Sequence, residues 1–162
     1  MATRVQAGLP SVAATTWSID ESRALYNIEG WGIGYFDVNE QGHAVVCPDL
    51  SRPDLKLDLF TMAMDRAEQG VGLPVLLRFS DILRSRIETL CGTFERAIKE
   101  FDYDRQYTLV YPIKVNQQRH VVEEIVQFGA RHGVGIECGS KPELQAVLAL
   151  TESTDHLIVC NG

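Results

Sequence analysis

Four polar residues stand at the ends of apolar segments that are typical of buried strands. The segments cover residues 75–79, 108–113, 134–138 and 157–160. The polar residues at or just after their carboxyl ends are Arg78, Lys114, Glu137 and Asn161. Ligands of α/β proteins bind at the carboxyl ends of parallel strands, so these side chains are candidates for one shared pocket. Each of them alone is also consistent with a polar side chain where a strand meets solvent.

Lys114 has the most specific chemistry of the four. Its neighbours Ile113 and Val115 are apolar, and we expect them to withdraw the ammonium group partly from water. Partial desolvation favours the neutral amine, which is the form that makes a Schiff base with a carbonyl cofactor or substrate. A lysine in such a position is often only structural, and the pattern alone leaves both interpretations open.

Predicted helices alternate with the four strands. Apolar residues recur at steps of three and four from Ser80, the expected N-cap, to Phe101. A second predicted helix ends near Gly133, and a third begins at the capping-box pattern Ser140–Glu143. This alternation is typical of a parallel sheet covered by helices. It fits a complete doubly wound sheet of four strands, or the first half of a (β/α)8 barrel.

The stretch 17–72 is predicted to be an extension built of a helix, a β-hairpin and a second helix. A capping-box pattern at Ser18–Glu21 begins the first helix. Strands are expected at 31–38 and 44–47, and apolar residues at helical spacing continue from Leu57 to a helix end at Gly70.

Three glycines in the region of the first hairpin strand, Gly30, Gly32 and Gly34, have the wrong spacing for a nucleotide-binding loop. We expect them to allow close backbone packing in that strand. Residues 1–16 are rich in Ala, Thr and Ser and lack the apolar core of a secretory signal, and we expect them to be disordered.

Composition excludes several classes of partner. The chain has 162 residues with 15 Lys+Arg and 22 Asp+Glu, a net charge of −7, which argues against binding nucleic acid or an anionic membrane. No apolar run approaches the ~20 residues that span a bilayer. The four cysteines have no metal-ligand spacing, and we expect buried free thiols in a reducing cytoplasm. They are Cys47, Cys91, Cys138 and Cys160.

The segments that contain the candidate residues closely resemble the biosynthetic arginine decarboxylases, a family related to enzymes with the alanine-racemase-like barrel. The segment around Lys114, Tyr-Pro-Ile-Lys-Val-Asn-Gln-Gln, is the most specific part of this resemblance. The segments that carry the resemblance are 31–37, 76–83, 111–118, 137–144 and 159–162.

The resemblance implies an α/β fold in which residues 73–162 are the first four strands and three helices of a (β/α)8 barrel that binds pyridoxal 5′-phosphate (PLP). It implies Lys114 as the lysine that binds PLP covalently, with Glu137 holding the lysine or the cofactor in place. The implied reaction converts L-arginine to agmatine and CO2, the entry to putrescine and spermidine synthesis. It further implies a homo-oligomer and an association with Mg2+, for which the sequence offers no ligand set.

Members of this family are several times longer than 162 residues, so we expect an N-terminal part of a longer enzyme that is inactive alone. The phosphate-binding loop and the substrate pocket of the family lie beyond Gly162. Two other functions stay open at this point. One is a non-catalytic truncated relative that binds decarboxylase subunits, and the other is a small flavodoxin-like binding domain.

Overall fold

The computed structural model describes residues 17–151 and 156–162 and divides them into two compact units. The first unit comprises residues 17–46 and 57–71, and the second comprises 47–56 together with the described residues from 72 onward. The disorder expected for 1–16 lies outside the described residues. We describe each unit by itself.

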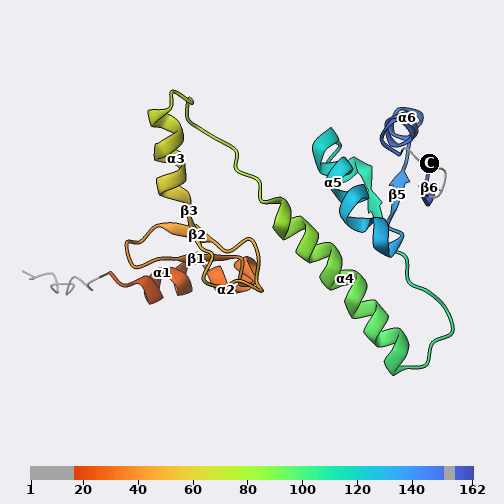
Figure 1. The fold of residues 1–162 in the computed structure, drawn as a ribbon, viewed down its shortest axis with the longest axis horizontal. Coiled ribbons are helices and arrows are strands. Elements are labelled where there is room, and N and C mark those ends of the chain that lie inside the picture. Colours follow the sequence, from red (N-terminus) through yellow and green to blue (C-terminus); the bar gives the residue numbers. More distant parts are fainter. Residues whose placement is uncertain (1–16, 152–155) are drawn as a thin grey trace, which may run out of the picture. The chain divides into compact units, whose positions relative to one another are not determined.

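The first unit is a small antiparallel sheet with three helices (Figure 1). Its sheet has the order β1-β2-β3, with Phe36 opposite Val46 and Val46 opposite Leu57. Its elements are α1 (Ile19–Leu25), α2 (Ile28–Gly32), β1 (Phe36–Val38), β2 (Ala44–Val46), β3 (Leu57–Asp58) and α3 (Leu59–Glu68).

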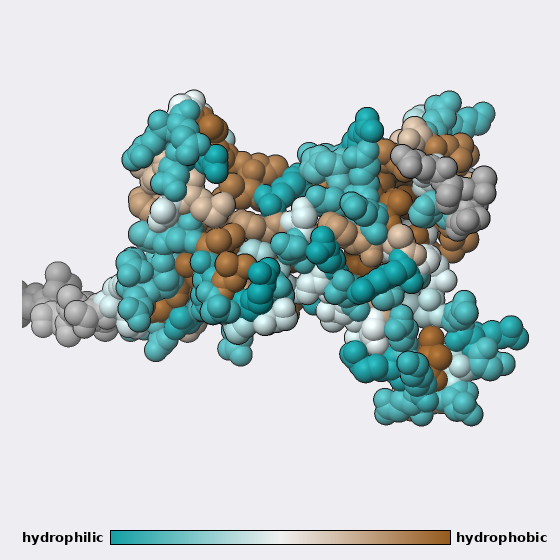
Figure 2. All heavy atoms as spheres, in the orientation of Figure 1, coloured by the Kyte–Doolittle hydropathy of each residue, from teal (hydrophilic) through white to brown (hydrophobic). Residues whose placement is uncertain are grey.

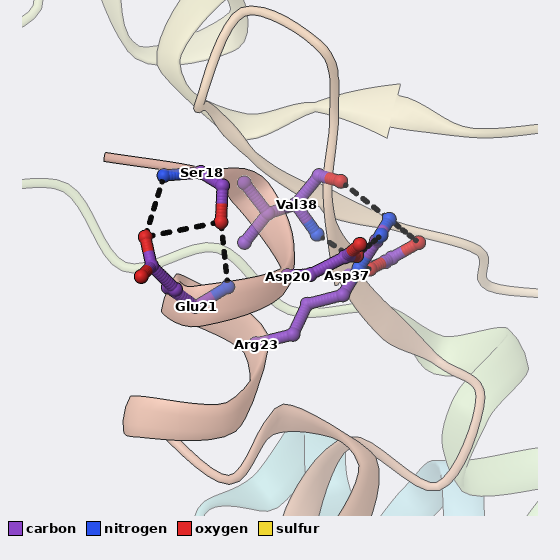
Figure 3. Close-up of polar contacts among 6 residues, drawn as sticks. All are labelled: Ser18, Asp20, Glu21, Arg23, Asp37 and Val38. Atoms are coloured by element: carbon purple, nitrogen blue, oxygen red, sulfur yellow. Dashed lines mark hydrogen bonds and ion pairs between the residues drawn. The ribbon is translucent and has the colours of Figure 1, made fainter. Parts of the chain in front are cut away.

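The predicted capping box at the start of α1 is confirmed (Figure 3). The Ser18 hydroxyl accepts from the Glu21 backbone N–H at 3.2 Å, and the Glu21 carboxylate accepts from the Ser18 N–H at 3.1 Å. One turn later, Arg23 ties α1 to β1. Its guanidinium donates to both carboxylate oxygens of Asp37, at 2.7 and 3.1 Å, and to the Val38 carbonyl at 3.0 Å.

The predicted strand at 31–38 is wrong for its first half. Gly30 and Gly32 lie in helix α2, and only Phe36–Val38 forms a strand. Gly34 has φ +81°, a backbone conformation that glycine adopts without a steric penalty, and there the chain turns from α2 into β1. Gly30 and Gly32 are therefore part of a short helix, and Gly34 allows the turn that follows it.

A third strand of this sheet, β3, was not predicted. Asp58 ends it and also caps α3, because its carboxylate accepts from the Thr61 N–H at 2.9 Å. The same carboxylate meets His43 Nδ1 and Asn39 Nδ2, each at 2.8 Å, so it joins the hairpin turn to the helix. The helix predicted to end at Gly70 is confirmed as α3, which is capped by Gln69.

The second unit contains a parallel sheet of order β4-β5-β6 (Figure 1). Helices connect its strands, as the alternating pattern predicts. The elements are α4 (Ser80–Glu100), β4 (Val110–Pro112), the 3-10 turn η1 (Ile113–Val115), α5 (Arg119–Gly129), the 3-10 turn η2 (Ala130–His132), β5 (Gly135–Cys138), α6 (Lys141–Leu150) and β6 (Ile158–Cys160).

The core of this unit lies on one face of the sheet, under α5 and α6. Ile136 and Cys138 of β5 pack there against Val122 of α5 and Val147 of α6. A second cluster joins α4 to α5 through Ile87 and Ile125. Figure 2 shows hydrophobic residues gathered around β5 and α6. Because alternate residues of a strand point to opposite faces, the core determines which side chains lie on the other face.

The predicted first strand, 75–79, is not a strand in the structure. These residues are not paired with the sheet β4-β5-β6, and Leu76 is 76% exposed. An apolar segment becomes a strand only when another strand accepts its backbone hydrogen bonds, and the described part of the chain does not supply one here. Ser80 is also not the N-cap. It is the first residue of α4, and its hydroxyl donates to Glu124 at 2.6 Å, linking α4 to α5.

Candidate functional site

The candidate site lies at the carboxyl edge of the parallel sheet, on the face that is not covered by α5 and α6. Ile136 and Cys138 face those helices, so Glu137 between them faces the other side. In the register of the sheet Glu137 lies beside Pro112 of β4 and Val159 of β6. The half-buried Glu137 carboxylate is therefore positioned by the central strand.

Glu137 and Asn161 are brought together, as the pattern of strand ends predicts. Asn161 follows β6 by one residue and lies two residues beyond Val159, the residue paired with Glu137. Its Nδ2 donates to Glu137 Oε1 at 3.2 Å, and its backbone N–H donates to the Cys138 carbonyl at 2.9 Å. The amide thereby sets the direction of one carboxylate oxygen.

Lys114 lies at the same edge, in the turn η1 that follows β4 directly. Two contacts hold the turn and the loop after it. The Tyr111 hydroxyl donates to the Asn116 carbonyl at 3.2 Å, and the Asn116 side-chain oxygen accepts from the Gln118 N–H at 3.0 Å. Burial raises the pKa of Tyr111, so its hydroxyl remains a donor.

The expected desolvation of Lys114 is wrong for this chain. Ile113 is only 1% exposed and packs in the core, but Lys114 is exposed and Val115 is 70% exposed. The 3-10 turn directs Ile113 inward and places the next two residues outside. Within residues 17–151 and 156–162, the Lys114 ammonium has no hydrogen bond or ion pair, so it is an accessible primary amine.

Arg78 reaches the loop that follows Lys114, where its guanidinium hydrogen-bonds to the Gln118 side chain. It does not contact Glu137 or Asn161 through any hydrogen bond or ion pair in the part of the chain that the structure describes. The four predicted residues thus form two contacts at one edge: Glu137 with Asn161, and Arg78 with the Lys114 loop.

Two features of the edge were missed by the reasoning from sequence. Tyr111 and Gln118 hold the Lys114 loop, although the specific segment 111–118 already contained them. Gly139 lets the chain after β5 approach the chain after β6, because a Cβ on it would lie 3.2 Å from the Asn161 carbonyl oxygen. The sequence signal that could have indicated these two features is the occurrence of polar and glycine residues just after the predicted strand ends.

The described residues contain neither a metal cluster nor a helix that could span a membrane. Among residues 17–151 and 156–162, no three His, Cys, Asp or Glu side chains come together in an arrangement suited to a metal ion. The helices in these same ranges are too short or too polar to cross a bilayer.

Comparison with known proteins gives three matching results. Residues 86–162 match the family model described as pyridoxal-dependent decarboxylase, pyridoxal binding domain. The biosynthetic arginine decarboxylase of Shewanella halifaxensis is 48% identical over 151 residues, which are 91% of this chain and 24% of that protein. The enzyme of the same name from Nostoc sp. is 46% identical over 153 residues, 94% of this chain and 22% of the relative.

A solved structure agrees with these sequence matches. The biosynthetic arginine decarboxylase from Campylobacter jejuni superposes with a TM-score of 0.75 at 31% identity, over 85% of this chain and 22% of that one. This neighbour and the matching family model fit a barrel fold that binds PLP.

The parallel sheet and the lysine at its carboxyl edge lie inside the stretch that matches the pyridoxal binding domain of pyridoxal-dependent decarboxylases. Along nearly its whole length the chain is similar to biosynthetic arginine decarboxylases, which confirms the resemblance of its motifs. The chain spans about a quarter of the length of the curated relatives it matches.

Proposed function

We propose that this chain contributes the PLP-binding lysine and one side of the active site to a longer enzyme that converts L-arginine to agmatine and CO2. The product places the reaction at the entry to putrescine and spermidine synthesis. The observation that supports this most is the position of Lys114: an exposed primary amine at the carboxyl edge of a parallel sheet, inside the stretch 86–162 that matches a pyridoxal-binding domain. Residues 73–162 would be the first part of the barrel, and 17–72 an extension before it.

The residues present fit PLP. A primary amine is the group that a pyridoxal aldehyde requires, and Lys114 is accessible for it in a turn held by Tyr111. When bound, PLP supplies an electron sink for the charge left on the substrate by the loss of CO2. The contribution of the chain is then to hold the amine at the edge of the sheet.

Glu137 would orient the lysine or the cofactor at the carboxyl edge of the sheet. Its carboxylate is half-buried, and one of its oxygens accepts a hydrogen bond from Asn161. This hydrogen bond orients the whole carboxylate and therefore also its second oxygen. A carboxylate acts there as an acceptor for a cationic neighbour, such as the lysine or the protonated part of the cofactor. Glu137 would thus be a positioning residue, and Asn161 supports its orientation.

Three further properties belong to the same proposal. The enzyme would act in the cytoplasm, which agrees with four cysteines that are all free thiols. It would be a homo-oligomer and would be associated with Mg2+, as the resemblance to the family implies. The ligands of that Mg2+ would come from outside the described residues, because these hold no suitable cluster.

The assignment of Lys114 is tested in the longer protein. Reduction with borohydride after loading with PLP, followed by peptide mapping, should place the pyridoxyl group on Lys114. Lys114→Arg should abolish turnover and the label while preserving the fold, since arginine keeps the charge but forms no Schiff base. Lys141→Arg, on the other side of the same edge, is the matched control and should keep both. A label on Lys141 or Lys99 would contradict the assignment.

A further inference from the structure

Two cysteines face each other at the carboxyl edge of the parallel sheet. Cys138 ends β5, Cys160 ends β6, and the two are direct partners in the register of the sheet. Their Sγ atoms lie 3.8 Å apart. Both side chains point to the face that α5 and α6 cover, whereas Glu137 points to the other face. The pair is therefore separate from the candidate site, although it belongs to the same strand ends.

The geometry allows a bond between the two sulfur atoms. Neighbouring strands of a sheet lie about 4.8 Å apart. Disulfides join residues whose Cα atoms are ~4.4–6.8 Å apart, so adjacent strands fall inside this range near its lower end. The sulfur atoms must approach by less than 2 Å from the 3.8 Å they have as thiols, given an S–S bond of about 2.05 Å. Small rotations of the two side chains supply that movement.

The two thiols differ in accessibility. Cys138 is buried, while Cys160 is exposed, which corrects the expectation that all four cysteines are buried. A cavity of about 330 Å³ opens beside both, and Lys141 and the first residues of α6 also line it. A lysine and the positive end of a ten-residue helix favour negative charge on a reacting sulfur. Burial is the main cause that raises the pKa of Cys138, and Cys160, Glu143 and Glu137 add to it.

We propose that Cys138 and Cys160 form a dithiol site that low-molecular-weight disulfides, of the class of oxidised glutathione, convert reversibly into an intramolecular disulfide. The exposed Cys160 thiolate attacks one sulfur of the small disulfide, whose S–S bond breaks and releases one thiol. Cys138 then loses its proton and attacks the Cys160 sulfur of the mixed disulfide, and the second small thiol leaves. The pair loses two electrons and two protons, and the small disulfide gains them as two thiols.

This reaction would tie β5 to β6 one residue from Glu137 and one residue from Asn161. The proposal does not depend on decarboxylase activity, because it follows from the positions of two thiols. Of the other cysteines, Cys47 donates to backbone carbonyls at 3.3 and 3.6 Å, and Cys91 is buried in the cluster between α4 and α5. These two provide the matched controls.

The test uses the purified 162-residue chain with oxidised glutathione under non-denaturing conditions. Intact mass should fall by about 2 Da with no retained glutathione, as expected for exchange that ends in an internal disulfide. Cleavage after glutamate, for example at Glu143, separates the two cysteines and should show them in one disulfide-linked pair of peptides. Cys91→Ser and Cys47→Ser should behave like the parent.

Two variants separate the two steps. Cys138→Ala should keep one glutathione on Cys160 and release it more than about tenfold more slowly than the parent, because no resolving thiol remains. Cys160→Ser should acquire neither glutathione at Cys138 nor a disulfide in the same time.

A second measurement needs no oxidant. Phenylarsine oxide should bind one per chain and release one water, and either variant should abolish this binding because arsenic(III) then lacks its second sulfur. In urea with oxidised glutathione, the parent should instead give several cysteine pairings. A parent chain that retains glutathione without closing, or that pairs Cys138 or Cys160 with another cysteine in the native state, would overturn the proposal.

Discussion

At the scale of single residues, Asp58 makes several contacts that no sequence motif predicted. Its carboxylate caps α3 and binds the side chains of His43 and Asn39. The pKa of Asp58 is lowered from 3.8 to about 2, mainly by the hydrogen bond from the Thr61 N–H, and the hydrogen bonds from His43 and Asn39 contribute to this lowering. One charged carboxylate therefore connects the hairpin turn to the helix that follows β3.

The lowered pKa predicts how stability depends on pH. A depressed pKa in the folded state contributes stability above the unfolded value of 3.8, and this contribution is lost as the pH falls toward 2. Asp58→Asn should therefore have a lower Tm than the parent at neutral pH, and the difference should shrink between about pH 4 and pH 2. Thermal melts across this range measure it. Asp65→Asn, on the exposed side of α3, is the control and should show no such narrowing.

Tyr111 is the residue that joins the core to the Lys114 loop. Its ring packs against both apolar clusters, and its hydroxyl donates to Asn116. Tyr111→Phe should keep the packing and lose only this hydrogen bond, which costs about 1 kcal/mol. Urea unfolding monitored by circular dichroism gives the free energy of unfolding. The control is Tyr103→Phe, at an exposed tyrosine, which should change the free energy of unfolding by less than about 0.5 kcal/mol. Equal effects of the two variants would contradict the role of Tyr111.

At the scale of elements, α6 shows how a helix is divided between core and solvent. Ser140 caps it as predicted, accepting from the Glu143 N–H at 3.4 Å, but the Glu143 carboxylate accepts from Gly139 at 2.7 Å, one residue earlier than the capping-box pattern implies. Adjacent residues in the helix have opposite surroundings: Val147 is fully buried against β5, and Leu148 is 57% exposed.

This contrast within α6 predicts a difference between neighbouring substitutions. Val147→Ala should destabilise the chain by about 2 kcal/mol, because it removes buried methyl groups and leaves a cavity. Leu148→Ala removes a larger side chain and should cost less than about 0.5 kcal/mol, since that side chain is largely in water already. Denaturant titration of the two variants beside the parent measures both. A larger cost for Leu148→Ala would show that α6 packs on the sheet through a different face.

At the scale of the whole molecule, α5 and α6 cover one face of the parallel sheet among the described residues of the second unit. The opposite face carries Val110, Pro112 and Val159, which are only half-buried. The strands β4 and β6 also form the two edges of the described sheet. Apolar faces and unpaired strand edges promote association with other chains.

We therefore predict that the purified 162-residue chain self-associates and does not decarboxylate arginine. Size-exclusion chromatography with light scattering should show species larger than 18.1 kDa. Release of CO2 from labelled arginine, with saturating PLP, should stay at the background level. A full-length relative assayed in parallel provides the positive control. A monomeric chain with turnover within about tenfold of that relative would contradict this prediction.

The sequence by itself determined the features that depend on residues a few positions apart. The capping box of α1, the N-cap of α6 and the alternation of strands and helices around the sheet all arise in this way, because helix caps and side-chain periodicity are local. The motif around Lys114 likewise indicated the family without any knowledge of the fold.

Only the tertiary structure decided which segments find partners. The apolar segment 75–79 has the sequence pattern of a strand but pairs with no strand of the described residues. The two residues of β3, in contrast, form a strand because β2 lies beside them. The exposure of Lys114, the contact of Asn161 with Glu137 and the approach of Cys160 to Cys138 follow from turns and strand register. These features depend on residues that lie far apart along the chain, and a backbone group or side chain takes its structure from a distant partner only after the chain has folded.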